Sequence, residues 1–241
     1  MRLIPFNREV LIGESVVIGE IDGKHLAKVL RFKKGDIVKL YTPSGRVFLS
    51  IIEDVHKNDV TVIVKSREAD LNPPSNKLTI VQGILKSERF EWVLQKSCEL
   101  GVFSIIPFIS KRTVCKPDAN KIERWGKIIT AASKQSGNPY PPKLNEISTF
   151  DKALKKLSDE FLKIIFYEEG GKSLKDILTY DNKMGNVALI IGSEGGFERD
   201  EIELAMRNNC IVSSLGWRIL RGETAAITSI SIAQYYLGEL G

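Results

Sequence analysis

The sequence predicts an α/β protein of two domains, in which a small β-barrel precedes a larger domain built on a mostly parallel sheet. Two patterns indicate this fold class. Short runs rich in valine and isoleucine fill residues 1 to about 70, and strand-like runs alternate with helical ones after them. Two prolines and three small polar residues at 72–76 form a stiff connector between the two patterns. We therefore expect one domain over residues 1–71 and another over residues 72–241.

The first domain is expected to contain short strands and one helical stretch. Leu26, Val29 and Leu30 recur at helical spacing within residues 25–31, so His25, Lys28 and Arg31 project elsewhere. A barrel with a basic rim results. Turn residues separate four candidate strands, which cover residues 15–18, 36–42, 46–55 and 60–65.

The second domain is expected to alternate strands with helices. A helix over 88–100 carries apolar residues at helical spacing, and Gly101 follows where a left-handed cap residue ends a helix. A second helix runs from Asn120, an N-cap with Glu123 in the capping-box position, to Gly137. An apolar helix over 225–240 closes the chain. The expected strands cover residues 78–85, 103–109, 162–167 and 187–191.

Composition limits the classes of protein that fit. A chain of 241 residues with 43% hydrophobic content can bury a full core, and its net charge of +5 favours a polyanionic partner only weakly. No stretch is long and apolar enough for a membrane span, and the first residues lack a signal-peptide core, so we expect a cytoplasmic protein with no membrane contact. Cys98, Cys115 and Cys210 lie far apart, which favours reduced thiols and no metal site.

A glycine-rich turn follows the strand that ends near Ile191. Residues 192–197 read Gly-Ser-Glu-Gly-Gly-Phe and lead into a helix with acidic first residues. Glycines at the carboxyl end of a parallel strand let the backbone approach a ligand closely. A tight turn without a ligand is the alternative. The turn is neither a nucleotide P-loop nor a dinucleotide fingerprint, because no Gly-Lys-Ser/Thr follows and no GxGxxG occurs.

A second segment, residues 213–226, places two arginines, a glutamate and a threonine before the final apolar helix. A purely structural helix entry rarely needs two arginines. The alternative is that Arg218 and Arg221 are solvated and that Glu223 offsets them near the positive end of the helix.

These segments, in their order and spacing, resemble the RsmE family of ribosomal RNA methyltransferases within the SPOUT superfamily. The resemblance spans nearly the whole chain. It rests on His25-Leu26, Val29 to Arg31, Gly35-Asp36, Gln95 to Gly101, Pro107, Arg124-Trp125, Ala131-Ala132, Gln135 to Gly137, Ile191 to Phe197 and Leu215 to Ala225.

The resemblance implies a PUA-like RNA-binding barrel over 1–71 and a SPOUT methyltransferase domain over 72–241. In that domain the carboxyl-terminal chain is threaded through a trefoil knot, an exception to the usual topology rules, and the knot forms the cofactor pocket. It further implies S-adenosylmethionine (SAM) as the cofactor and a homodimer as the assembly. The implied reaction methylates N3 of a uridine in the 16S ribosomal RNA of the small subunit.

The same resemblance assigns the candidate site residues. Residues 192–196, here the first loop, and 215–220, the second loop, match the family's two cofactor loops, and Arg221, Glu223 and Thr224 match its Arg-x-Glu-Thr run. Glu223 or Glu194 is the hypothetical base and Arg221 the electrostatic stabiliser; the alternative is that Arg221 and Glu223 pair to brace the knot or dimer. The expected cofactor contacts come from Ile191, Gly192, Glu194, Gly195, Gly196, Leu215, Gly216, Ile219, Leu220 and Thr224.

RNA contacts are expected from basic residues of the first domain and of the chain after the connector. Ser193 departs from the family's usual proline, and Asn138 stands where many relatives carry arginine. The candidate RNA-binding residues are Arg2, Arg8, Lys24, Lys28, Arg31, Lys33, Lys34, Lys86 and Arg89.

Two other functions remain open from the sequence. One is a non-catalytic assembly factor that binds ribosomal RNA. The other is a SPOUT methyltransferase that acts on another RNA, such as transfer RNA, or on a ribose 2′-hydroxyl. The identity of the methylated atom distinguishes this second alternative from methylation of uridine N3 in 16S ribosomal RNA.

Overall fold

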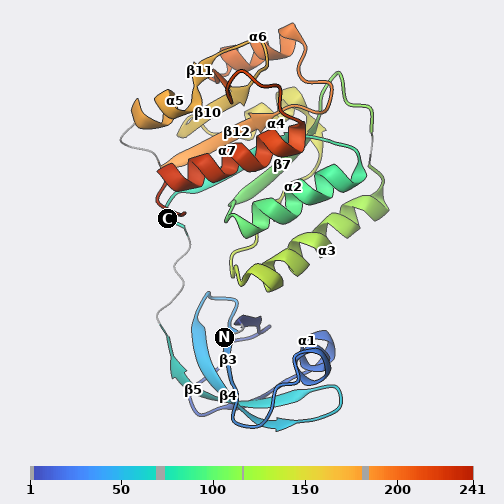
Figure 1. The fold of residues 1–241 in the computed structure, drawn as a ribbon, viewed down its shortest axis with the longest axis vertical. Helices are drawn as coiled ribbons and strands as arrows, with labels where there is room; N and C mark the ends of the chain where they lie inside the picture. The colour runs from blue at the N-terminus through green and yellow to red at the C-terminus, as the bar shows by residue number, and fades with distance from the viewer. Residues whose placement is uncertain (1–2, 69–73, 116, 181–184, 241) are drawn as a thin grey trace. The chain divides into compact units, whose positions relative to one another are not determined.

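The computed structural model describes residues 3–68, 74–115, 117–180 and 185–240. The chain divides into two compact units, Met1–Pro73 and Pro74–Gly241, each with its own hydrophobic core (Figure 1). The domain boundary expected between residues 71 and 72 lies outside the described residues. Within the described ranges, no helix is long and apolar enough to cross a membrane.

The first unit is a five-stranded sheet with one helical segment. The strand order is β1-β3-β4-β5-β2, and every pair is antiparallel except β1 with β3. Two irregularities in the pairing of β4 with β5 help the sheet to bend, because a bulge increases local twist. The elements are β1 (Leu3–Pro5), β2 (Ser15–Ile18), α1 (Glu20–Lys24), the π-helical turn η1 (His25–Val29), β3 (Ile37–Tyr41), β4 (Val47–Val55) and β5 (Val60–Arg67).

The core of this unit follows from the way side chains alternate between the two faces of each strand. Val60, Val62 and Val64 of β5 are fully buried, and they pack with residues from the other strands and with Leu26 of η1. The four predicted strands are confirmed, with ends shifted by one or two residues. The predicted helix over 25–31 is too long. It ends at Val29, and Arg31 adopts a left-handed backbone with φ 54°. Strand β1 was not expected, because three residues carry too little pattern.

The second unit is an eight-stranded sheet in which all strand pairs are parallel. The order is β11-β13-β10-β12-β6-β7-β8, and β9 also pairs with β7. The strands are β6 (Lys77–Gly83), β7 (Ser104–Ile109), β8 (Lys143–Leu144), β9 (Ser148–Thr149), β10 (Phe161–Phe166), β11 (Lys172–Ser173), β12 (Asn186–Ile191) and β13 (Ile211–Ser214). The alternating pattern of the sequence therefore predicts the parallel sheet correctly.

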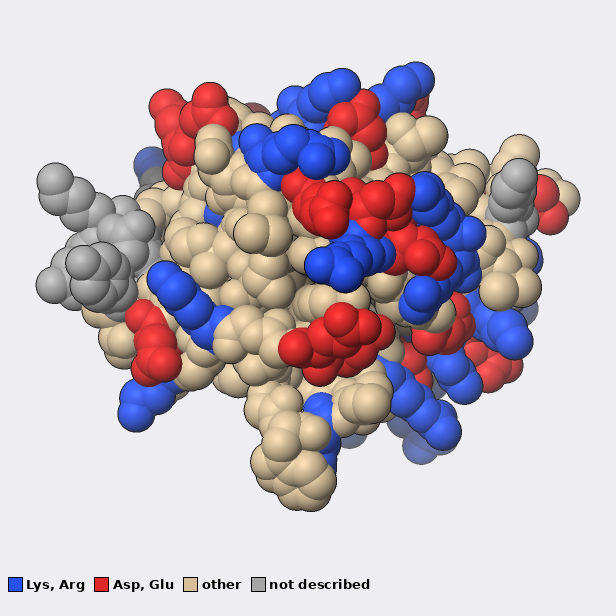
Figure 2. All heavy atoms as spheres, turned by 90° about the horizontal axis from the view of Figure 1, so that it is seen from above, with Lys and Arg blue, Asp and Glu red and all other residues tan. Residues whose placement is uncertain are grey.

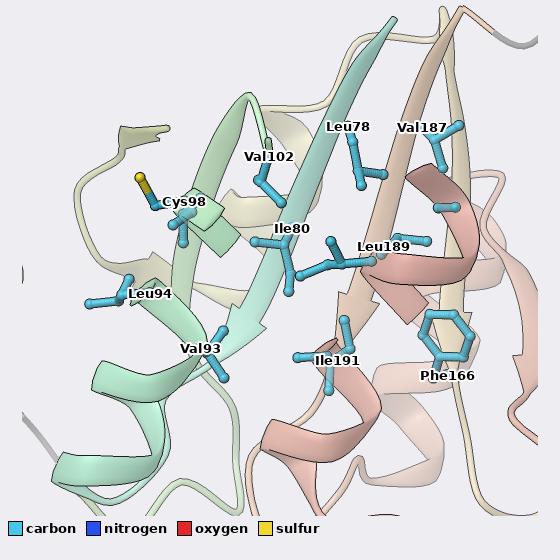
Figure 3. Close-up of a cluster of buried hydrophobic side chains, with 14 of the residues drawn as sticks. Leu78, Ile80, Val93, Leu94, Cys98, Val102, Phe166, Val187, Leu189 and Ile191 are labelled. Carbon is cyan, nitrogen blue, oxygen red and sulfur yellow. The ribbon is translucent and has the colours of Figure 1, made fainter. Parts of the chain in front are cut away.

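Helices cover both faces of this sheet. Side chains from α2, α3, α5 and α7 share one core cluster with Ile80 and Leu189, and part of this cluster is drawn in Figure 3. Side chains from α4 and α6 share the other cluster with Val81 and Ile190. Neighbouring residues of one strand thus point into opposite layers. The helices are α2 (Ser87–Glu99), α3 (Ala119–Ser136), α4 (Phe150–Lys155), α5 (Leu174–Tyr180), α6 (Arg199–Arg207) and α7 (Gly222–Tyr236).

Two helices begin or end at other residues than the sequence predicts. The N-cap of α3 is Asp118, whose carboxylate accepts a hydrogen bond from the Lys121 N–H, so the capping box predicted from Asn120 is wrong. Gly101 and Gly137 do follow their helices in left-handed backbone, both with φ 71°. Helix α7 spans Gly222–Tyr236 instead of 225–240, which brings Glu223 and Thr224 into its first turn.

Candidate active site

A cavity of about 280 Å³ opens where three neighbouring strands end. Strand β10 lies between β12 and β13, and because the three are parallel, their carboxyl ends meet at one edge of the sheet. The first loop follows β12 and the second loop follows β13, so the structure brings the two loops together. The lining consists of Arg89, Phe166 to Glu168, Ile191 to Phe197, Ser214 to Gly222 and Ala225.

The first loop is fixed by buried hydrogen bonds. The fully buried Gln82 donates from Nε2 to the carbonyl oxygens of Gly83 (2.9 Å) and Gly192 (3.1 Å). The Gly196 N–H donates to the Ser193 carbonyl at 3.0 Å, which closes a tight turn. These contacts hold the backbone of the loop against the end of β6.

The second loop is more open. Leu215 is half-buried, whereas Trp217 and Ile219 are 86% and 85% exposed. All three line the cavity, and the apolar contact of Ile219 with a cofactor stays a prediction. The Arg218 guanidinium lies over the Trp217 ring, 4.9 Å from its centroid. Sequence reasoning did not single out Trp217, because an isolated tryptophan in a loop has no pattern.

Three charged side chains lie together beside the cavity. The Arg89 guanidinium is 3.7 Å from a Glu223 carboxylate oxygen and 3.9 Å from one of Glu194. Arg89, expected to bind RNA, therefore lines the cavity from the first turn of α2. Glu223 forms its ion pair with Arg89, and the described residues contain no ion pair between Glu223 and Arg221 within the chain. A bracing role of this pair in a dimer stays a prediction.

Glu223 and Glu194 differ in their hydrogen bonds. Glu194 accepts a hydrogen bond from the Lys86 backbone N–H at 2.8 Å and lines the cavity. Glu223 is 7% exposed and its Oε2 has no hydrogen-bond partner, an arrangement that is costly for a buried carboxylate unless it serves a ligand. Glu223 and Thr224 lie outside the lining, whereas Arg221 is exposed within it.

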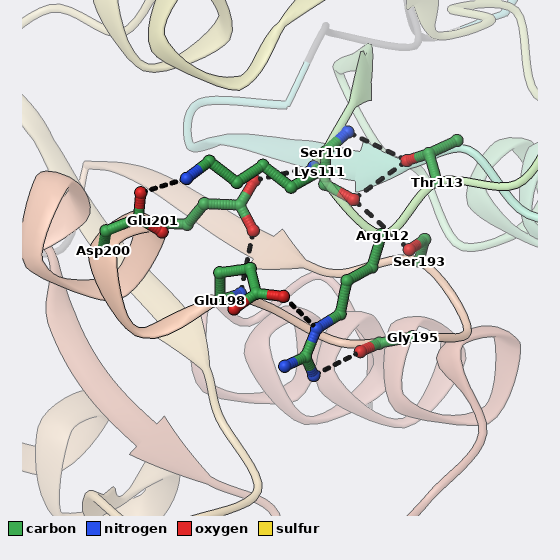
Figure 4. Close-up of polar contacts among 9 residues, drawn as sticks. All are labelled: Ser110, Lys111, Arg112, Thr113, Ser193, Gly195, Glu198, Asp200 and Glu201. Carbon is green, nitrogen blue, oxygen red and sulfur yellow. Dashed lines mark hydrogen bonds and ion pairs between the residues drawn. The ribbon is translucent and has the colours of Figure 1, made fainter.

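A short turn after β7 clamps the first loop (Figure 4). Arg112 donates hydrogen bonds to the Glu198 carboxylate at 2.7 Å and to the Gly195 carbonyl at 2.9 Å, and the Ser110 and Ser193 hydroxyls lie 3.3 Å apart. The hydrogen bond to Glu198 is the main cause that raises the pKa of Arg112. Lys111 adds an ion pair to Asp200. Ser193 thus gains a partner that proline lacks, and this clamp was not foreseen from the sequence.

The basic residues expected to bind RNA are mostly exposed. Lys24, Lys33 and Lys34 are exposed in the first unit, Lys28 donates a hydrogen bond to Asn58 at 3.2 Å, and Arg8 pairs with Glu14 at 2.7 Å. Lys86 and Arg31 are exposed, and Arg2 lies outside the described residues. On the face seen in Figure 2, basic and acidic side chains alternate without a continuous basic field.

Metal and thiol chemistry have no visible support at this site. Among the described residues no group of three or more His, Cys, Asp or Glu side chains is arranged to hold a metal ion. The three cysteines are free. Burial raises the pKa of Cys98 to about 12 and that of Cys210 to about 11, so neither supplies a thiolate at neutral pH.

Comparisons with known proteins agree with this architecture. Residues 72–234 match the RNA methyltransferase domain family, and residues 18–65 match the RNA methyltransferase PUA domain. Ribosomal RNA small subunit methyltransferase E of Rickettsia conorii is 34% identical over 212 residues, which cover 86% of this chain and 84% of that protein.

Two solved structures are similar over the full length. Ribosomal RNA small subunit methyltransferase E from Neisseria gonorrhoeae, bound to SAM, superposes with a TM-score of 0.86 at 27% identity and covers 98% of this chain and 97% of its own. A Legionella pneumophila methyltransferase in complex with SAM gives a TM-score of 0.83 at 35% identity over 98% of both chains. The resemblance found in the sequence is confirmed: the chain belongs to the RsmE family of ribosomal RNA methyltransferases.

Proposed function

We propose that this protein is a SAM-dependent methyltransferase that methylates N3 of a uridine in the 16S ribosomal RNA of the small ribosomal subunit. The observation that carries the proposal is the cavity itself, which both family loops line and beside which Arg89, Glu194 and Glu223 lie. The two solved relatives bound to SAM support the choice of cofactor.

The lining of the cavity fits SAM. Gly192, Gly195 and Gly196 have no side chains that would keep a ligand away from the loop backbone, while Ile191 and Leu215 offer apolar surface. Carboxylates at Glu168 and Glu194 suit a cofactor that carries positive charge. When bound, SAM supplies a methyl group on a positively charged sulfur, and transfer of that group to a nitrogen depends chiefly on alignment. The trefoil knot implied by the family stays a prediction.

Glu223 is the proposed proton acceptor. Uridine N3 carries a proton that must leave when the new N–C bond forms, and a nearby carboxylate can accept it. Glu223 has an oxygen without a partner and a cation, Arg89, beside the other oxygen. Glu194 uses its carboxylate to hold the Lys86 N–H, which makes it the second choice.

Arg221 is the proposed electrostatic stabiliser. When N3 loses its proton, negative charge spreads onto the uracil oxygens, and a guanidinium close to them lowers the barrier. Arg221 lines the cavity at the start of α7, and its guanidinium makes no hydrogen bond or ion pair with another residue that the structure describes. Its guanidinium is therefore available to a substrate.

The RNA must present the base outside its stack, because N3 lies on the Watson–Crick edge. We propose that the exposed lysines of the first unit contact phosphates and position the strand. A homodimer, carried over from the family, is part of the same proposal. A substrate in the small subunit places the reaction in the cytoplasm.

A transfer assay tests whether the protein is an enzyme. The purified protein is incubated with SAM labelled in its methyl group and with small subunits that lack the modification. We expect label in 16S RNA, with the signal lost in an Arg221→Ala variant by roughly 10²- to 10³-fold. Tight RNA binding without any label would favour the non-catalytic assembly factor.

A further inference from the structure

Glu168 occupies a central place in the cavity. It lies two residues beyond the end of β10, the strand between β12 and β13. The first loop follows β12 and the second loop follows β13, so Glu168 leaves the sheet between the two segments that form the cofactor cavity. It lines that cavity together with them.

The carboxylate of Glu168 lies directly against the first loop. A Cβ atom added to Gly196 would lie 2.9 Å from Oε1 and 3.3 Å from Oε2 of Glu168, so both oxygens face the backbone of this glycine. Gly196 has a φ of 67°, the left-handed conformation that glycine adopts without strain.

Two other carboxylates at the first loop already accept hydrogen bonds from the protein. Glu194 accepts the Lys86 N–H, and Glu198 accepts from Arg112, whose guanidinium also donates to the Gly195 carbonyl. Among the described residues, the side chain of Glu168 makes no hydrogen bond or ion pair. Its charge is a minor cause of the raised pKa of Arg112, after Glu198, and of the raised pKa of Tyr167, after burial and Glu169. Glu168 is exposed at the wall of the cavity, so its carboxylate oxygens can accept hydrogen bonds from a bound ligand in place of water.

We propose that Glu168 binds the cofactor by accepting hydrogen bonds from its N–H or O–H donors. This inference rests on the proposed function, which makes SAM the occupant. SAM offers two sets of such donors, the hydroxyls of its ribose and the ammonium of its amino-acid part. A carboxylate accepts from either, and hydrogen bonds with an ionised partner are roughly twice as strong as neutral ones.

Calorimetric titration of the full-length protein tests this role without measuring activity. Three ligands are compared: SAM, S-adenosylhomocysteine, and methylthioadenosine, which has the adenine and ribose but not the amino-acid part. The variants are Glu168→Ala and Glu168→Gln. Glu169→Gln is the matched control, because this neighbouring glutamate does not line the cavity.

We expect Glu168→Ala to weaken SAM binding roughly 10- to 100-fold, with a smaller loss in Glu168→Gln and none in Glu169→Gln. Equal losses for all three ligands would assign the contact to the ribose. A loss for SAM and S-adenosylhomocysteine, with methylthioadenosine unchanged, would assign it to the ammonium.

Affinities of both Glu168 variants within twofold of the wild type would overturn the proposal. If the alanine variant does not fold, the glutamine variant decides, because it keeps the size of the side chain and removes the charge. Failure of the wild-type protein to bind SAM would instead reject the proposed function, so the two failures are distinguishable.

Discussion

At the scale of single residues, Glu223 and Glu194 share one cation but are suited to different tasks. Both have a carboxylate oxygen within 4.0 Å of Arg89, yet only Glu223 is buried with an oxygen that has no partner. A carboxylate oxygen that already accepts a hydrogen bond from the protein has a structural role, whereas an oxygen without a partner is available to accept a proton. The two residues therefore allow a direct test of the base.

Amide substitution separates the two glutamates. Glu223→Gln removes the proton acceptor, and we expect kcat to fall roughly 10²- to 10⁴-fold with little change in SAM affinity. Glu194→Gln keeps an oxygen for the Lys86 N–H, so kcat should fall by less than tenfold. Single-turnover kinetics with saturating SAM measure both, and the reverse order of effects would make Glu194 the base.

Arg112 is predicted to act on cofactor binding alone. Arg112→Ala removes the hydrogen bonds to Gly195 and Glu198, so the first loop loses its clamp. The expected result is a KM for SAM raised roughly tenfold, with kcat unchanged at saturating SAM. Arg199→Ala, which removes an exposed ion pair within α6, is the control. A fall in kcat at unchanged KM would contradict this account of the clamp.

Motifs in the sequence identified several of these residues but not their partners. The family pattern located Glu194, Arg221 and Glu223, whereas Arg89 was assigned to RNA because a single arginine gives no sign of what it faces. Asn138, which replaces a common arginine, turns out to be structural, since its amide donates to the Cys98 carbonyl at 2.9 Å. Partners that are distant in the chain follow only from the fold.

At the scale of elements, the end of β6 and the first loop are packed backbone to backbone. A Cβ atom added to Gly83 would lie 2.5 Å from the Ser193 nitrogen and 2.7 Å from the Gly192 carbonyl carbon. Gly222, at the start of α7, likewise leaves room for Leu85, whose Cδ2 would be 2.9 Å from a Cβ atom there. Gly222 therefore packs closely against Leu85.

Alanine substitution of a closely packed glycine and of a glycine with open space around it tests this packing. Gly83→Ala forces the first loop to move, and we expect a loss of about 1–3 kcal/mol in stability and at least a tenfold loss in SAM affinity. Gly126→Ala, in α3 with open space around it, should stabilise the protein by about 0.5–1 kcal/mol. Thermal unfolding and calorimetry measure both, and a Gly83→Ala protein with normal affinity would refute the tight packing.

Element prediction succeeded where the pattern was long. The buried runs of β6, β7, β10 and β12 and the periodic helices α2 and α3 were expected within two residues of their observed ends. The short elements β8, β9, β11, α4 and α5 were not, because two to seven residues carry no reliable period. Their positions depend on pairing and packing with distant strands.

At the scale of the whole molecule, the proposal divides the work between two units. The first unit supplies exposed lysines, and the second supplies the cavity. The two-domain fold class followed from the change of pattern near residue 72, and the family resemblance supplied the cofactor and the reaction. Composition alone could not have supplied either, because a net charge of +5 fits many proteins.

The salt dependence of RNA binding tests the role of the first unit. A variant with Lys24, Lys28, Lys33 and Lys34 changed to Gln should bind RNA more weakly, and the slope of log K against log salt should flatten by up to about 3. A control with Lys152, Lys155, Lys172 and Lys175 changed to Gln loses the same charge from the second unit. Equal effects in the two variants would mean that net charge, not the first unit, governs binding.

The identity of the methylated nucleoside tests the central claim most directly. Small subunits that lack the modification are treated with the protein and labelled SAM, and the 16S RNA is digested to nucleosides and separated. The account predicts that the label elutes with 3-methyluridine. Label in a 2′-O-methylated nucleoside or in another base would contradict it, because the methylated atom would not then be uridine N3.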